Sequence, residues 1–215
     1  MRSLSLSAEE FRKLAHRLSD FLAAYLETLP DLPSYPPGLT GADTERLFAS
    51  ADLPWNGLGD AAFDAMAQVF RYARPSSPRF FGYVFGSGEP IAALGDFAAA
   101  VLNQNATAWR SAPAGVTLER TVVRWLAEAV GCTGFSGSLT LGGSSANLMG
   151  LCIAREAKAP ANQSGVRGGV VYCSAEAHMS IAKAAALLGL GHDAVRLIPV
   201  DPSFRMRIDA LRHAI

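Results

Sequence analysis

A short apolar segment that runs into a glycine-rich turn and then into a helix most constrains the fold of this chain. The run is Gly-Ser-Leu-Thr-Leu-Gly-Gly-Ser-Ser-Ala-Asn over residues 137–147. Its hydropathy predicts a strand over 138–141 and a helix over 146–158, with two glycines at the turn. Further strands are predicted at 170–173 and 195–199, and further helices at 178–188 and from 209 onward. Short apolar strands that alternate with helices indicate an α/β fold with a parallel sheet covered on both faces.

Only helices and connectors are predicted before this region. Ser7 and Glu10 form a capping box, from which an amphipathic helix with a wide apolar stripe runs to Pro30. The prolines between residues 31 and 41 predict an extended connector. Further helices are predicted at 43–50, 60–72, 91–103 and from 113 onward, with an aromatic segment at 79–86. The wide stripe of the first helix requires a surface to pack against.

Composition excludes several classes of partner. Half of the residues are apolar, which supports a buried core, and the formal net charge is zero. No broad positive field therefore points to nucleic acid or to an anionic membrane, and no apolar run is long enough to span a bilayer. The three cysteines form no Cys-x-x-Cys pair, and the first residues do not resemble a signal peptide. We expect a cytoplasmic protein without a structural metal.

The glycine turn is a candidate anion site. Free backbone N–H groups and the helix dipole favour negative charge at a helix N-terminus, and the Ser144 and Ser145 hydroxyls add donors. The turn matches neither the Walker motif, which needs a Gly-Lys pair, nor the dinucleotide fingerprint, which needs a third glycine. A tight strand-to-helix connection without a ligand is the alternative.

His178 is the second candidate. It is predicted at the carboxyl end of a strand, on the sheet edge where open α/β sheets bind ligands and where the glycine turn also lies. The alternative is a structural histidine. A serine hydrolase with Ser144 as nucleophile is disfavoured, because Ala146 replaces the last glycine of that motif and His178 follows too early for the hydrolase order.

Five segments in order resemble one known family. They are Pro78–Tyr83, Leu118–Leu126, Gly142–Leu148, His178–Ala184 and Asp201–Met206. The set resembles the group II pyridoxal-phosphate amino-acid decarboxylases, relatives of the aromatic-amino-acid and glutamate decarboxylases. The resemblance covers nearly the whole chain but only about the N-terminal half of such an enzyme.

This resemblance implies a fold, a cofactor and an activity. The fold is part of the large domain of the fold-type I (aspartate aminotransferase-like) transferases, over residues 75–215. A helical segment over 1–74 would precede it and pack across a partner in a homodimer. The activity is decarboxylation of an L-amino acid to an amine and CO2 with pyridoxal 5′-phosphate, which withdraws electrons from the substrate Cα.

The resemblance also assigns residues. It implies Gly143 and Ser144 as the phosphate-binding residues, His178 as the catalytic residue that stacks on the cofactor ring and orients the substrate carboxylate, and Tyr83, Phe85 and Gly86 as the lining of the substrate pocket.

Two groups that such an enzyme needs have no counterpart here. The family's covalently attached lysine and its acidic partner for the pyridine nitrogen lie C-terminal to the matched part, and Lys13, Lys158 and Lys183 match no such position. We therefore expect the isolated chain to be inactive. A non-catalytic subunit that needs a partner chain, and another fold-type I enzyme such as an aminotransferase or a cysteine desulfurase, are the alternatives. Departures at Ser77, Ala112, Val116 and Thr117 leave the substrate open.

Overall fold

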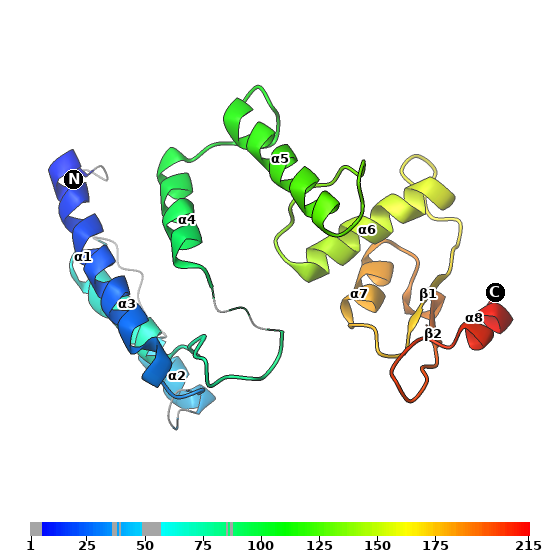
Figure 1. Cartoon of the computed structure of the whole chain (residues 1–215), viewed down its shortest axis with the longest axis horizontal. Coiled ribbons are helices and arrows are strands. Elements are labelled where there is room, and N and C mark those ends of the chain that lie inside the picture. Colours follow the sequence, from blue (N-terminus) through cyan, green and yellow to red (C-terminus); the bar gives the residue numbers. More distant parts are fainter. Residues whose placement is uncertain (1–5, 36–37, 39, 49–56, 85, 87) are drawn as a thin grey trace. The chain divides into compact units, whose positions relative to one another are not determined.

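The computed structural model describes residues 6–35, 38, 40–48, 57–84, 86 and 88–215. They fall into two compact units, Met1–Asn103 and Gln104–Ile215 (Figure 1). The first unit contains helices, and the second contains helices and a parallel pair of strands. The predicted division after residue 74 concerns the complete fold and stays a prediction.

The first unit begins with the predicted capped helix. Its helices are α1 (Ala8–Thr28), the 3-10 turn η1 (Leu29–Asp31), α2 (Gly41–Phe48), α3 (Ala61–Tyr72) and α4 (Pro90–Leu102). The Ser7 hydroxyl accepts the backbone N–H of Glu10 at 3.2 Å, and the Ser7 N–H donates to the Glu10 carboxylate at 2.8 Å. Both bonds of the capping box are present, so this prediction is confirmed.

Aromatic packing joins α1 to α3. The Phe70 ring of α3 meets the rings of Phe21 and Tyr25 edge-on, with centroids 5.1 and 4.9 Å apart. The Arg17 guanidinium lies 4.2 Å from the centroid of Phe63. Edge-to-face rings and a cation over a ring are favourable geometries, so part of the wide stripe of α1 packs within this unit.

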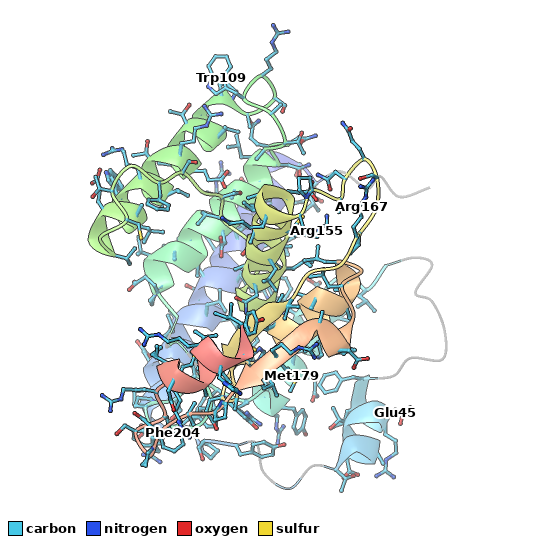
Figure 2. All side chains as sticks on the ribbon, turned by 90° about the vertical axis from the view of Figure 1, so that its right-hand side faces the viewer. Glu45, Trp109, Arg155, Arg167, Met179 and Phe204 are labelled. Atoms are coloured by element: carbon cyan, nitrogen blue, oxygen red, sulfur yellow. The ribbon has the colours of Figure 1, made fainter. Side chains whose placement is uncertain are left out.

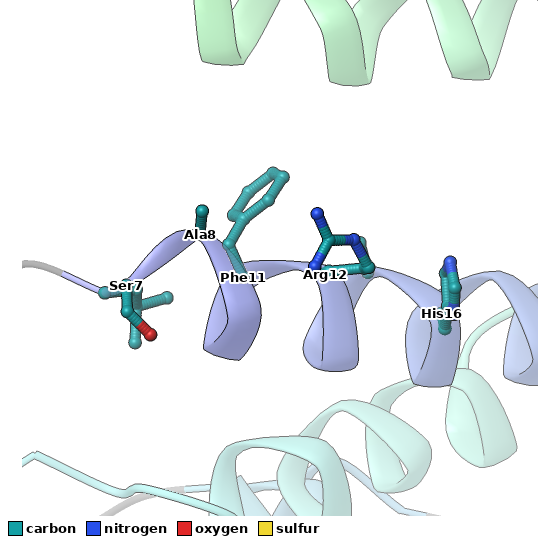
Figure 3. Close-up of a pocket in the computed structure, with 7 residues that line it drawn as sticks. Ser7, Ala8, Phe11, Arg12 and His16 are labelled. Atoms are coloured by element: carbon teal, nitrogen blue, oxygen red, sulfur yellow. The ribbon is translucent and has the colours of Figure 1, made fainter.

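The N-terminal end of the same stripe borders an open hollow of about 780 Å³. Phe11 projects from α1 beside it (Figure 3) and stacks on Phe97 of α4, with ring centroids 6.1 Å apart. Arg12 and His16 contribute the polar part of the lining. Phe11 remains 42% exposed, so this end of the stripe is only partly covered within the unit.

The second unit has the predicted α/β order. Its elements are α5 (Pro113–Ala129), α6 (Gly143–Lys158), β1 (Val171–Ser174), α7 (Ser180–Leu187), the 3-10 turn η2 (His192–Ala194), β2 (Val195–Ile198) and α8 (Ile208–Ala214). The strands β1 and β2 are parallel, with Val171 opposite Val195 and Ser174 opposite Ile198. Helix α7 forms the connection between these strands and packs beside α6 (Figure 1). The predicted parallel pairing is confirmed for these two strands.

The strand predicted at 138–141 is wrong. Residues 138–140 have no regular secondary structure, Leu141 lies in a bend, and no strand pairs with them among the described residues. Polar groups of this segment bond to a side chain of α5 instead of to a strand. The Glu119 carboxylate of α5 accepts the Leu139 N–H at 2.9 Å and the Ser138 hydroxyl at 3.1 Å. The apolar pattern is that of a buried strand, yet Leu141 is fully exposed. A strand forms only where a neighbour supplies the ladder of hydrogen bonds.

The second unit has a small core, which includes the buried residues Ala112, Val116 and Ala161. Ala184 and Ala185 of α7 and Ile198 of β2 are buried. Large apolar side chains of α5 are uncovered, because Leu118, Trp125 and Leu126 are each more than half exposed.

Three further findings concern the described part of the chain. Cys132, Cys152 and Cys173 are free thiols. Residues of the metal-binding types form no cluster there that could hold an ion. None of the helices described combines the length and apolar character needed to cross a bilayer.

Candidate cofactor site

The glycine turn opens an uncapped helix N-terminus. Gly142 has φ +117° and ψ 172°, a conformation that is open essentially to glycine alone. The first bond of α6 runs from the Ala146 N–H to the Gly142 carbonyl at 3.0 Å. The N–H groups of Gly143, Ser144 and Ser145 precede that bond, and no described side chain caps them. They are therefore available to an anion, which the helix dipole also favours.

The two adjacent glycines give a matched pair of predictions. Gly142→Ala will destabilise the second unit by about 1–2 kcal/mol, because an alanine is strained at this φ. Gly143→Ala will be neutral or stabilising by up to about 1 kcal/mol, because Gly143 is helical and its added Cβ meets no atom within 4 Å. Urea unfolding followed by circular dichroism measures both. Equal losses of stability would contradict the assigned backbone conformation.

His178 lies in the segment between β1 and α7, and its Nδ1 faces Ser180, the first residue of α7. The backbone N–H of Ser180 donates to Nδ1 at 3.2 Å, and the Ser180 hydroxyl lies 2.9 Å from the same nitrogen. Ser180 is 3% exposed, whereas His178 is exposed. The buried serine thus holds one edge of the imidazole and leaves the rest of the ring accessible.

A third residue connects this histidine to the glycine turn. Asn147, the fifth residue of α6, donates its amide N–H to the Ser180 hydroxyl at 2.8 Å. The hydrogen bonds from Asn147 through Ser180 to His178 connect the beginning of α6 to the segment that carries His178. Sequence reasoning did not select Asn147 or Ser180 as site residues, although both lie inside the motifs that it quoted.

The hydrogen bonds of His178 do not support the serine-hydrolase alternative. Nδ1 of His178 is engaged by Ser180 rather than by Ser144. Within the described residues, the Ser144 hydroxyl has no hydrogen bond to a histidine. A serine nucleophile needs such a base within hydrogen-bond reach.

The predicted substrate-pocket residues belong to the first unit. Tyr83 is exposed and has φ +61°, an uncommon conformation for a residue other than glycine. The Arg74 guanidinium lies 5.2 Å from its ring centroid, and also 5.1 Å from that of Phe80 and 5.0 Å from that of Tyr35. Gly86 is exposed, and Phe85 lies outside the described residues. Sequence reasoning did not identify Arg74, whose contacts join segments separated in the chain.

The three lysines are exposed, and Asp201 is engaged in a turn of its own. Lys13 lies on α1, Lys158 ends α6 and Lys183 lies on α7, and all three are exposed. The carboxylate of Asp201 accepts the N–H groups of Ser203 and Arg205 at 2.8 and 3.0 Å and pairs with the Arg205 guanidinium. The Arg205 N–H, with that guanidinium and the Ser203 N–H, holds the pKa of Asp201 below its usual value. Asp201 therefore stabilises its own turn.

A polar cluster at the other end of α6 holds this helix to α7. The Arg155 guanidinium (Figure 2) donates to the Leu188 carbonyl at 2.8 Å and pairs with Glu156 at 2.9 Å. Glu156 also accepts the N–H groups of Ala161 at 3.1 Å and Asn162 at 3.3 Å. Burial alone would raise the pKa of Glu156, but these N–H groups and Arg155 outweigh it and lower the pKa below its usual 4.5.

This lowered pKa predicts acid sensitivity of the second unit. A carboxylate whose pKa falls on folding stabilises the fold above its unfolded pKa, and this stabilisation is lost as the pH falls through the folded value. Urea midpoints between about pH 7 and about pH 3 should therefore fall less for Glu156→Gln than for the unchanged chain. Parallel curves for the two proteins would contradict the assigned role of Glu156.

Comparison with known proteins specifies the class of this α/β unit, in which hydrogen bonds connect a helix with an uncapped N-terminus to an accessible histidine. Residues 59–215 match the family described as the pyridoxal-dependent decarboxylase conserved domain. The chain belongs to this family. It is 33% identical to a tyrosine decarboxylase of Oryza sativa subsp. japonica, over 99% of this chain and 42% of that protein. It is 34% identical to the cysteine sulfinic acid decarboxylase of Homo sapiens, over 80% of this chain and 37% of that protein.

Solved structures confirm the fold class. The structure superposes on Catharanthus roseus tryptophan decarboxylase in complex with L-tryptophan with a TM-score of 0.82 and 27% identity, over 99% of this chain and 48% of that one. The protein has part of the fold-type I decarboxylase fold, with α/β order after N-terminal helices. The chain spans less than half the length of these relatives.

Proposed function

We propose that this chain is the cofactor-cradling part of a pyridoxal-phosphate-dependent decarboxylase that converts an L-amino acid to an amine and CO2. The observation that carries the proposal is the hydrogen-bonded connection between the beginning of α6 and His178. This connection supports the proposal, because a phosphorylated ring cofactor requires a helix N-terminus for its phosphate close to a group that can cover its ring.

The residues at this end fit such a cofactor. Gly143 and Ser144 hold the phosphate through backbone N–H groups and the serine hydroxyl, and the open space at Gly143 admits close approach. His178 covers the ring and orients the substrate carboxylate, so it is the catalytic residue of this half. Pyridoxal phosphate supplies the electron withdrawal from the substrate Cα that loss of CO2 requires. The chain's own contribution is binding and orientation.

The substrate pocket includes Tyr83, Phe85 and Gly86 in this proposal. Its substrate is an L-amino acid, and the relatives named above act on both aromatic and acidic ones. The family match favours a decarboxylase over an aminotransferase or a cysteine desulfurase.

The functional unit is larger than this chain. Lys13, Lys158 and Lys183 are exposed at positions that do not correspond to the family's cofactor lysine, so the isolated chain is inactive in this proposal. A homodimer of the complete enzyme would bury the N-terminal end of the α1 stripe, which is only partly covered here. The free thiols fit the reducing cytoplasm. A non-catalytic subunit that completes its site with a partner chain is the second candidate, favoured by the same lack of a cofactor lysine.

Ligand titration tests the proposal without catalysis. Pyridoxamine 5′-phosphate avoids covalent attachment to surface lysines, and pyridoxamine is its control without the phosphate. We expect calorimetry to show tighter binding of the phosphorylated compound, weakened by Ser144→Ala and by His178→Ala. The exposed residues Ser164 and His213 supply the matched controls, Ser164→Ala and His213→Ala. Equal binding of both compounds, or equal loss in all four variants, would contradict the proposed site.

A further inference from the structure

The hydrogen bonds around His178 have one consistent direction. A backbone N–H can only donate, so the bond from the Ser180 N–H makes Nδ1 of His178 an acceptor and places the ring proton on Nε2. The Ser180 hydroxyl then donates to the same Nδ1 at 2.9 Å, which leaves its oxygen as an acceptor. The Asn147 amide donates to that oxygen at 2.8 Å. The donors thus follow the order Asn147, Ser180, His178.

We infer that Asn147 and Ser180 are positioning residues that fix His178 in its neutral Nε2–H form and fix the plane of its ring. The tautomer and the ring plane follow from the hydrogen bonds alone, whereas their use in cofactor binding rests on the proposed function. Neither residue needs to touch the cofactor or the substrate, because both act through the imidazole.

Burial makes this arrangement specific. Ser180 is 3% exposed, so water does not readily replace Asn147 as the donor to its hydroxyl. Asn147 belongs to α6 and Ser180 to α7, so the ring is anchored to both helices. His178 itself is exposed, and its Nε2–H has no hydrogen bond to a described residue. A fixed donor at Nε2 suits an anionic group such as a carboxylate.

The test reverses the direction of the hydrogen bond between residue 147 and the Ser180 hydroxyl. Asn147→Asp replaces an amide donor with a carboxylate that can only accept, so the Ser180 hydroxyl turns toward residue 147 and presents its lone pairs to Nδ1. Asn147→Leu removes the donor without this reversal, because the hydroxyl can still donate to Nδ1. The two variants therefore separate donor direction from loss of packing.

Long-range ¹H–¹⁵N spectra of the histidine-labelled 215-residue chain report the tautomer directly. In spectra recorded at about pH 8, we expect His178 to be entirely in the Nε2–H tautomer in the unchanged chain and in Asn147→Leu. In Asn147→Asp the Nε2–H share should fall in favour of a protonated Nδ1, because the lone pairs of the hydroxyl, 2.9 Å from Nδ1, then oppose the backbone N–H at 3.2 Å. His213 is the internal reference for an exposed imidazole. An unchanged share in Asn147→Asp, or a mixture at His178 in the unchanged chain like that at His213, would overturn the inference.

A second measurement connects the inference to the proposed function. Ser180→Ala retains the backbone donor but loses the hydroxyl that holds the ring, and we expect it to bind pyridoxamine 5′-phosphate about fivefold more weakly, the effect of one hydrogen bond. Its circular dichroism spectrum should match that of the unchanged chain, which shows that the fold is retained. Unaltered affinity would overturn the positioning role. Should the unchanged chain bind no pyridoxamine phosphate, the proposed function fails, while the tautomer measurement still decides the inference.

Discussion

Supplied with pyridoxal phosphate and with L-tyrosine, L-tryptophan or L-cysteine sulfinate, the purified chain will release CO2 no faster than the free cofactor does. Catalysis by this class of enzyme requires a lysine that holds the cofactor covalently. The chain has three lysines, all exposed, and in our proposal none of them is the lysine that holds the cofactor. Release of ¹⁴CO2 from carboxyl-labelled substrates measures the rate.

The control for this prediction is His178→Ala, which alters the proposed catalytic residue and leaves the lysines unchanged. A rate above that of free pyridoxal phosphate that falls in His178→Ala would contradict the prediction, because it would show that the chain alone performs catalysis. Co-expression with a polypeptide that carries the rest of a decarboxylase and its lysine should restore activity if the chain is a partner-dependent subunit.

Of the substitutions described above, Arg155→Ala will lower the free energy of unfolding of the second unit most, by about 3 kcal/mol. It removes a charge-assisted hydrogen bond to a backbone carbonyl and a largely buried ion pair. The Arg155 side chain is only 13% exposed and is bonded to Leu188, Glu156 and Asn162. The substitution should therefore separate the C-terminal end of α6 from the end of α7. Urea unfolding of the second unit, followed by Trp109 and Trp125 fluorescence, measures the change.

Arg124→Ala is the matched control for Arg155→Ala. The Arg124 side chain is 59% exposed, and its one ion pair among the described residues is with Glu128 on its own helix, at 3.1 Å. An exposed pair of this kind contributes about 0.3–0.5 kcal/mol. Similar losses in the two variants would show that the buried position of Arg155 has no special importance.

Features set by residues close in the chain were predictable from the sequence. The capping box of α1 needs only Ser7 and Glu10, and both of its bonds are formed. The glycine turn is equally local, because φ +117° at Gly142 and the uncapped start of α6 depend on adjacent residues. The helices of both units were predicted to within a few residues for the same reason.

Features that depend on distant partners were not predictable. The segment 138–141 has the pattern of a strand, but the Glu119 carboxylate rather than a neighbouring strand takes its hydrogen bonds. Asn147 and Ser180 lie in different helices, and nothing in either local pattern indicates that they are 2.8 Å apart. The contacts of Arg155 with the end of α7 are of the same kind. Such pairings follow from tertiary packing, which periodicity does not encode.

The proposed function requires that the beginning of α6 and His178 bind a phosphorylated pyridine ring. The most direct measurement is an NMR titration of the ¹⁵N-labelled chain with pyridoxamine 5′-phosphate, which follows every backbone amide and histidine ring separately. We predict saturable shifts of the Gly143, Ser144 and Ser145 amides and of the His178 ring, with His16 and His213 unaffected. Saturable shifts at other residues, while these four remain unchanged in a folded chain, would contradict the account.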